Sequence, residues 1–326
     1  MNRTKQHLIA LLLATVCSAP GAALAQGTYP TKPIHMVVPF APGGATDIVG
    51  RVMATEMTKT LGQTVLVENR PGNAGATGAD IVAKSAPDGY TLCLCTVGPL
   101  ITVPLLNPSL GYDPLRDLLP VSVVNTVELA IFARETLPAT TPSQLVAYAK
   151  ANPGKISYAT PGTGGPNHFA GELLQIMAGL KLLHVPFKGD GQAIIALAGG
   201  QVDLYLGGIA SALPQVKAGK VKPIMVTGAS RSKLLPDIPT VSESGYAGYE
   251  ASVFSGIAVA AGTTPAIVER LYNAIAAAVK VKSVQETFDA QGIIPVGGRP
   301  EAFTALLKTE MEKWARVQKQ TGIKLD

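Results

Sequence analysis

Residues 34–47 have the sequence IHMVVPFAPGGATD, which joins three kinds of local structure. The apolar run Ile34–Val38 predicts a buried strand. The Pro- and Gly-rich residues 39–45 break that strand. Apolar residues then recur at the spacing of one helix face over residues 46–61, and Gly62 follows where a helix commonly ends. The stretch therefore predicts a strand, a glycine-rich loop and a helix in immediate succession.

The same alternation continues along the chain. Further strands are predicted at residues 64–68, 90–96, 156–159, 182–185, 202–206 and 221–227, with two short strands or a crossing segment at 122–132. Further helices are predicted at residues 73–86, 167–178, 191–198, 210–218, 264–280, 284–290 and 300–320, and one that starts after Thr141. This rhythm favours an α/β fold in which helices cover parallel-type sheets.

The composition describes a folded, turn-rich chain of about two domains. Its 326 residues are 47% hydrophobic, which is too apolar for a disordered chain, and they include 34 glycines and 25 prolines. The formal net charge is +5, and no dense run of Lys and Arg accompanies it. Nucleic acid is therefore not an expected partner.

Residues 1–25 are predicted to be a secretory signal peptide. A basic start precedes the apolar residues 8–16, and Ala23-Leu24-Ala25 fits the small-residue pattern of a cleavage site. The apolar run is too short to span a bilayer, which takes about 20 residues. Cleavage after Ala25 would leave residues 26–326 as a periplasmic protein. An uncleaved membrane anchor and lipidation at Cys17 are the alternatives.

Cys93 and Cys95 are the two cysteines beyond that segment, and they lie in the strand-like residues 90–96. Residues two apart in a strand point to the same face, but we expect their geometry to be poor for a mutual disulfide. We therefore expect two small, buried apolar side chains and a fold that does not depend on a disulfide. A metal site would need further ligands nearby, and the sequence offers none.

Two glycine-rich loops are the candidate ligand-binding segments of the sequence. Residues 42–47 (PGGATD) and 161–168 (PGTGGPNH) each lie between a predicted strand and a predicted helix. The first N–H groups of a helix lack acceptors within the helix, and with the helix dipole they favour an anion. Two such ends that face one cleft would hold an acid from both sides. The spacing alone also fits ordinary turns without a ligand.

Motifs for nucleotide binding and catalysis are absent from the sequence. It has no P-loop, no G-x-S-x-G and no H-E-x-x-H, and the glycines within residues 72–78 do not form G-x-G-x-x-G. His168, in the first turn after the second loop, is a candidate ligand contact, and Asp203 is either an ammonium partner or a turn residue. We expect no enzyme activity, cofactor or metal. Structural roles are expected for His35, His184 and Trp314.

A series of short segments, spread in order over nearly the whole mature chain, carries a family resemblance. These are residues 29–34 (YPTKPI), 37–44 (VVPFAPGG), 46–47, 67–72 (VENRPG), 86–92 (APDGYTL), 171–173, 184–189 (HVPFKG), 199–203 (GGQVD), 211–214 and 235–241 (LPDIPTV). In these segments the chain resembles the Bug receptors, which are the extracytoplasmic solute-binding proteins of tripartite tricarboxylate transporters.

The resemblance implies an α/β, two-lobed periplasmic-binding-protein fold of type II, with two helix-flanked sheets and a ligand cleft between the lobes. It implies a first lobe at residues 26–127 plus 252–326 and a second at 128–251. A receptor of this kind closes its cleft on a small carboxylate and delivers it to large and small integral membrane subunits. We expect it to be a monomer. The alternatives are a sensing protein that signals to a membrane sensor and an exported enzyme.

The resemblance also implies which residues contact the ligand. In the first loop they are Phe40, Ala41, Gly43, Gly44, Ala45, Thr46 and Asp47. In the second loop they are Thr160, Pro161, Gly162, Thr163, Gly164, Asn167 and His168. The strand end formed by Thr96, Val97 and Gly98 is expected to be a further wall.

The chain departs from the family pattern at two places. Many relatives have Phe-Asp where this chain has Leu206-Gly207, and that Asp suits an ammonium group. An amino-acid ligand is therefore disfavoured here, and a plain carboxylate, aromatic ones included, is favoured because Gly207 and Gly208 are expected to leave room. Relatives often have Ser-Ala-Gly-Asn-Gly-Ser where this chain has TPGTGG at residues 160–165, so that loop is expected to bind through its backbone.

Overall fold

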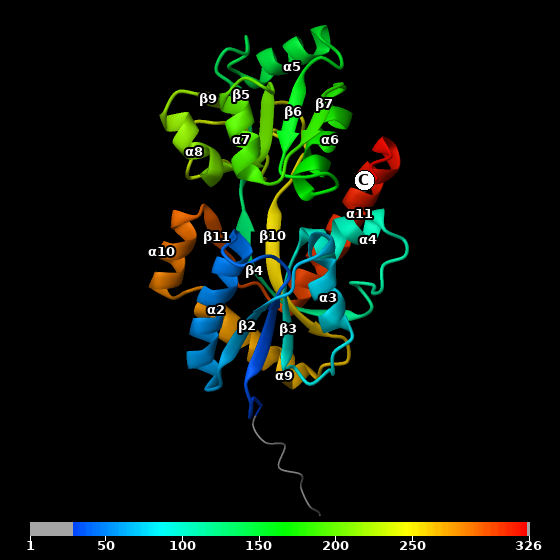
Figure 1. The fold of residues 1–326 in the computed structure, drawn as a ribbon, viewed down its shortest axis with the longest axis vertical. Coiled ribbons are helices and arrows are strands. Elements are labelled where there is room, and N and C mark those ends of the chain that lie inside the picture. Colours follow the sequence, from blue (N-terminus) through cyan, green and yellow to red (C-terminus); the bar gives the residue numbers. More distant parts are fainter. Residues whose placement is uncertain (1–28, 325–326) are drawn as a thin grey trace, which may run out of the picture.

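The computed structural model describes residues 29–324, and the chain there forms two lobes, each built on its own β-sheet (Figure 1). The predicted signal peptide and its cleavage site after Ala25 lie outside these residues. Between residues 29 and 324, no helix has the length and apolar character needed to span a membrane.

The first lobe contains a six-stranded mixed sheet. Its strands, in spatial order, are β11 (Ile293–Pro295), β4 (Leu118–Val127), β10 (Val253–Ala260), β3 (Thr91–Thr96), β1 (Ile34–Val38) and β2 (Val65–Asn69). Strand β10 runs antiparallel to both of its neighbours, whereas β1, β2 and β3 are parallel. One face of the sheet is covered by α2 (Ala45–Leu61), α9 (Pro265–Ala278) and α10 (Lys282–Ala290). The other is covered by α3 (Ala76–Ala83) and α11 (Pro300–Thr321).

The second lobe contains a five-stranded sheet. Its strands, in spatial order, are β7 (Leu183–Pro186), β6 (Ser157–Thr160), β8 (Leu204–Gly208), β5 (Leu129–Arg134) and β9 (Val221–Val226). Strands β6, β7 and β8 are parallel, and β5 is antiparallel to both of its neighbours. Helices α7 (Asp190–Ala198) and α8 (Ile209–Lys217) pack on one face, while α5 (Pro142–Ala151) and α6 (Pro166–Ala178) pack on the other.

The chain passes between the lobes twice, and one helix also bridges them. Strand β4 ends at Val127 and β5 begins at Leu129, so the apolar stretch around residues 122–132 forms parts of two strands, and the chain crosses between the lobes at Glu128. The return passage leads from β9 to β10. Helix α11 extends from the first sheet up to α6 of the second lobe (Figure 1). There the Trp314 ring meets Phe169 edge to face, with 5.8 Å between ring centroids.

The predicted helix at residues 73–86 is shorter and irregular at its start. A single turn, η1 (Asn73–Gly75), precedes α3, and both Asn73 and Ala74 have positive φ angles, of 47° and 49°. Only Gly adopts this conformation without steric cost. The residues that follow β2 therefore form a tight turn, and the helix begins at Ala76.

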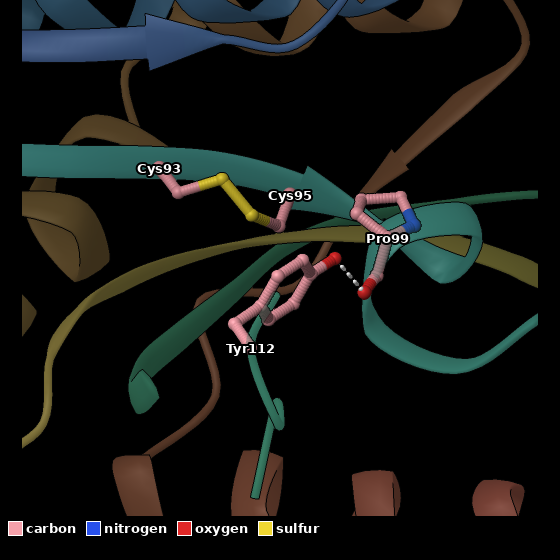
Figure 2. Close-up of a disulfide and its surroundings, with 4 residues drawn as sticks. All are labelled: Cys93, Cys95, Pro99 and Tyr112. Carbon is pink, nitrogen blue, oxygen red and sulfur yellow. Dashed lines mark hydrogen bonds between the residues drawn. A yellow bond between two sulfur atoms is a disulfide. The ribbon is translucent and has the colours of Figure 1, made fainter. Parts of the chain in front are cut away.

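Cys93 and Cys95 form a disulfide, so the expectation of two unpaired cysteines was wrong (Figure 2). That expectation assumed a regular strand, in which residues two apart are separated by about 6.7 Å. Their Cα atoms are 5.3 Å apart, well inside the range that disulfides span. Both residues are fully buried. Nearby, the Tyr112 hydroxyl donates to the Pro99 carbonyl at 2.5 Å (Figure 2).

The mature protein is predicted to contain no reactive thiol. Thiol titration of the denatured protein should detect none, and prior reduction should expose the two from Cys93 and Cys95. Because the disulfide closes a very short loop, Cys93→Ala with Cys95→Ala should lower the free energy of unfolding by only about 1–2 kcal/mol. Two thiols that titrate without reductant would contradict the prediction.

Candidate ligand-binding cleft

The carboxyl ends of parallel strands from both sheets lie at the junction of the lobes. In the first lobe, β1 leads into the first glycine-rich loop and β3 ends at Thr96. In the second lobe, β6 ends at Thr160 and leads into the second glycine-rich loop. Open α/β sheets bind their ligands outside these strand ends. The junction is therefore where a ligand site is expected.

A cavity of about 260 Å³ lies between the lobes. The first lobe supplies Phe40, Ala74, Thr96, Val97, Gly98, Thr102, Val103 and Val253 to its wall. The second lobe supplies Thr163, Gly164, Gly165 and Pro166. Of the described residues, none that lines this cavity carries a charged side chain. Its polar groups are hydroxyls and backbone amides on an otherwise apolar wall.

A smaller cavity of about 50 Å³ adjoins the first within the first lobe, and Thr96 and Val253 line both. Its other lining residues are Ala45, Thr46, Val49, Asn125, Val127, Phe254, Ser255 and Ile293. The buried hydroxyl of Ser255 donates to the Asn125 side-chain oxygen. This cavity reaches the beginning of α2.

The first helical turn of α2 presents backbone donors to the smaller cavity. Gly44 is the N-terminal cap, and no side chain supplies a capping hydrogen bond. Ala45 and Thr46 open the helix, so their N–H groups have no acceptor within it. The positive end of the helix dipole lies at the same point. An anion bound there would accept hydrogen bonds from these N–H groups and would be stabilised by the helix dipole.

Asp47 holds the first loop from the inside. Its carboxylate accepts hydrogen bonds from the Gly43 N–H at 2.9 Å, from Arg51 Nε at 2.9 Å and from Asn69 Nδ2 at 2.8 Å. Asn69 also donates to the Phe40 carbonyl at 3.0 Å. Burial opposes ionisation of Asp47, but the bonds from Arg51, Gly43 and Asn69 outweigh it and lower its pKa to about 2. The side chain therefore fixes the loop and lines neither cavity.

The second loop is held in a similar way by histidines. The Gly164 N–H donates to His168 Nδ1 at 3.1 Å. The His168 ring stacks on His184, with 3.7 Å between centroids. Thr160 Oγ1 lies 2.6 Å from His184 Nε2 and donates to the Gly162 carbonyl at 3.0 Å. His168 and Thr160 thus shape the loop, while Thr163 to Pro166 form the cavity wall.

The space over Gly207 is occupied by the chain's own tyrosine, so the expected room for a ligand is absent there. A Cβ at Gly207 would lie 2.0 Å from the Tyr205 ring. The two residues share one face of β8 because they are two apart. The Tyr205 hydroxyl donates to Asp190, at the start of α7, which keeps the ring over the glycine. Gly207 lines neither cavity.

The cavities bring together part of the predicted site. The predicted residues that line them are Phe40, Ala45, Thr46, Thr96, Val97, Gly98, Thr163 and Gly164. The predicted residues that line neither are Ala41, Gly43, Gly44, Asp47, Thr160, Pro161, Gly162, Asn167, His168 and Gly207. Asn167 instead donates to the Leu206 carbonyl at 3.3 Å.

Several lining residues were missed. Asn125 and Ser255 are polar residues within otherwise apolar strands, and that pattern could have identified them. Ala74, Thr102 and Val253 carried no such signal. Between residues 29 and 324, no group of three His, Cys, Asp or Glu side chains is placed to hold a metal ion.

Comparison with known proteins identifies the class to which this cleft belongs. Residues 49–323 match the tripartite tricarboxylate transporter family receptor. The chain is 37% identical to the protein BugT of Bordetella pertussis, with 100% of both chains covered. It resembles the structure of R. palustris Rpa4515 with adipate (33% identity, TM-score 0.78, 91% of this chain and 99% of that one). It also resembles MatC from Rhodopseudomonas palustris with bound malate, at 32% identity and a TM-score of 0.74. That comparison covers 89% of this chain and 99% of the other.

The chain belongs to the tripartite tricarboxylate transporter receptor family, which confirms the resemblance to the Bug receptors. Its two-lobed α/β fold is that of the periplasmic binding proteins, as expected. The family is one of receptors for tripartite tricarboxylate transporters, and its members include solute-binding proteins.

The ionised Asp47 carboxylate should stabilise the protein above about pH 4. Its native pKa of about 2 is below the ordinary value of 3.8, so this contribution is lost as the pH falls from about 4 to about 2. At pH 7, Asp47→Asn should lower the free energy of unfolding by about 2 kcal/mol. Denaturant titrations at decreasing pH should show the difference in unfolding free energy between the variant and the unmodified protein shrink towards pH 2.

Asp237→Asn is the matched control, because Asp237 is exposed on a loop. It should leave the unfolding midpoint nearly unchanged at every pH. A deficit in Asp47→Asn that stays constant from pH 7 to pH 2 would show that the carboxylate charge does not hold the loop.

Proposed function

We propose that the protein captures a small carboxylate in its interlobe cavity and delivers it to the large and small integral subunits of a tripartite transporter. The observation that carries the proposal is a cavity walled by both lobes, which is lined by the start of α6 and by threonines and by no charged side chain. The likeness to receptors with adipate and with malate supports the ligand class.

The carboxylate is balanced by hydrogen-bond donors. A buried carboxylate is costly unless it is hydrogen-bonded. The N–H groups of Ala45 and Thr46 at the start of α2 are available in the smaller cavity that adjoins the interlobe one. Hydroxyls of Thr96, Thr102 and Thr163 supply further donors. Asp47, Thr160 and His168, which line neither cavity, act by shaping the two loops.

The cavity lining favours a ligand without an ammonium group. No Asp or Glu side chain is among the described residues that line either cavity, so an ammonium would lack an anionic partner. The apolar walls formed by Phe40, Val97 and Val103 suit a hydrocarbon or aromatic body. The preferred ligand is therefore a plain organic acid.

Delivery depends on closure of the lobes. A ligand that contacts both lobes stabilises the closed arrangement by the contacts it gains there. Movement takes place at the two crossings, between a first lobe of residues 26–127 plus 252–326 and a second of 128–251. The protein acts as a periplasmic monomer after cleavage at Ala25, and it performs no chemistry on its ligand.

Thermal melting against a panel of acids tests the proposal. The protein is first unfolded and refolded to remove any bound ligand, and the panel spans citrate, tartrate, malate, aspartate, nicotinate, phthalate, terephthalate and protocatechuate. An acid at about 100 times its Kd should stabilise the fold by about 2.7 kcal/mol.

Thr96→Val should raise the Kd at least about tenfold, because Thr96 lines both cavities and the substitution removes its hydroxyl. Thr91→Val, at the opposite end of the same strand, is the matched control and should leave the Kd unchanged. A response to aspartate alone would contradict the preference for plain acids. No response to any acid would contradict the carboxylate proposal.

A further inference from the structure

The two lobes also meet at a point outside the cavity, where a glycine faces a helix of the other lobe. Gly292 lies between α10 and β11 in the first lobe. A Cβ built on it would lie 2.8 Å from the Ala210 Cβ and 3.2 Å from Leu234 Cδ1, both in the second lobe. Carbon atoms pack favourably at about 3.5–4.0 Å. The lobes can approach this closely only because residue 292 has no side chain.

This contact lies beside the crossing between the lobes. Ile293, the next residue, pairs with Val127 at the end of β4. On the other side, the Glu128 carbonyl accepts a hydrogen bond of 3.2 Å from the Ile209 N–H, one residue before Ala210. A contact so close to the hinge moves little during closure. A small displacement there therefore becomes a large one at the mouth of the cleft.

The second-lobe side of the contact is firmly held. Ala210 lies in the first turn of α8, so its backbone is fixed by the helix. The Leu234 N–H donates to Ser232 Oγ at 3.1 Å, and that hydroxyl donates to the Glu128 carboxylate. Leu234 can move its side-chain end, but the Ala210 Cβ cannot move away without the helix.

We propose that Gly292 and Ala210 form the stop that sets how far the lobes close. A side chain at residue 292 meets α8 before closure is complete, so it holds the cleft open. The inference rests on the proposed function for its effect on ligand binding. The limit to lobe movement follows from the contact itself and does not require a ligand.

Gly292→Ala is the direct test, and Gly219→Ala is its matched control. Both glycines have nearly the same left-handed backbone, with φ angles of +64° and +65°. A Cβ at Gly219 would have nothing within 4 Å. The two variants therefore share the backbone strain, and only the first adds a methyl group against the other lobe. Adding Ala210→Gly to Gly292→Ala removes the atom that would be struck.

Pulsed electron paramagnetic resonance measures the lobe-to-lobe distances. Spin labels at Thr55→Cys and Lys188→Cys, both exposed and one on each lobe, report them with and without each acid of the panel. The shortest distances should be lost in Gly292→Ala, kept in Gly219→Ala and restored in the double variant. The apparent Kd of any acid that binds should rise about tenfold in Gly292→Ala, because the closed fraction falls.

Ala210→Leu serves as a second variant that avoids a strained backbone, since Ala210 is helical. It should also remove the shortest distances. Identical distance distributions in Gly292→Ala and Gly219→Ala would overturn the stop. If the distances change as expected but no acid binds, the carboxylate proposal fails and the stop does not.

Discussion

The direct passage from β4 into β5 is the constraint on which the architecture depends. The two strands belong to different sheets and are separated by a single residue, Glu128. Its carbonyl holds the start of α8, and its carboxylate holds Ser232. So short a link keeps the sheets end to end. The carboxyl ends of their parallel strands must then face a common space, and the glycine-rich loops follow from those ends.

In the two loops, the residues whose hydrogen bonds hold the loop in shape differ from the residues that line the cavity. Asp47 and His168 are the ionisable side chains of the two loops, yet each accepts a hydrogen bond from the backbone of its own loop. The donors are the N–H groups of Gly43 and Gly164. The cavity is left with hydroxyls and backbone amides on an otherwise apolar wall. Such a lining suits an acid, because oriented dipoles distinguish charge sign without fixing one ligand shape. Similar structures with adipate and with malate share this fold, so one frame accommodates acids of different shape.

The sequence predicts the elements well where their signal is local. The helix expected at residues 46–61 is found at Ala45–Leu61, because its apolar spacing and terminal glycine are contained in the segment itself. The orientation of the Asp47 side chain cannot be predicted from that segment, because it depends on a hydrogen bond from Asn69 at the end of β2. The disulfide was missed for a related reason: the shortening of β3 between Cys93 and Cys95 has no sequence signal. Tyr205 over Gly207 is likewise a tertiary arrangement.

The interlobe contacts differ greatly in strength, and this difference determines where the molecule can open. At α11, the buried Trp314 packs on Phe169, and Lys313 donates to the Glu250 carbonyl at 3.1 Å. Exposing two large aromatic side chains costs several kcal/mol. The contact at Gly292 consists of a few carbon atoms, each worth about 0.1–0.2 kcal/mol. Opening therefore costs least when α11 stays on α6 and the lobes part beside β11. The Trp314 contact then stays in place as the lobes turn, and the Gly292 contact beside the crossing opens by the small displacement that the proposed stop would limit.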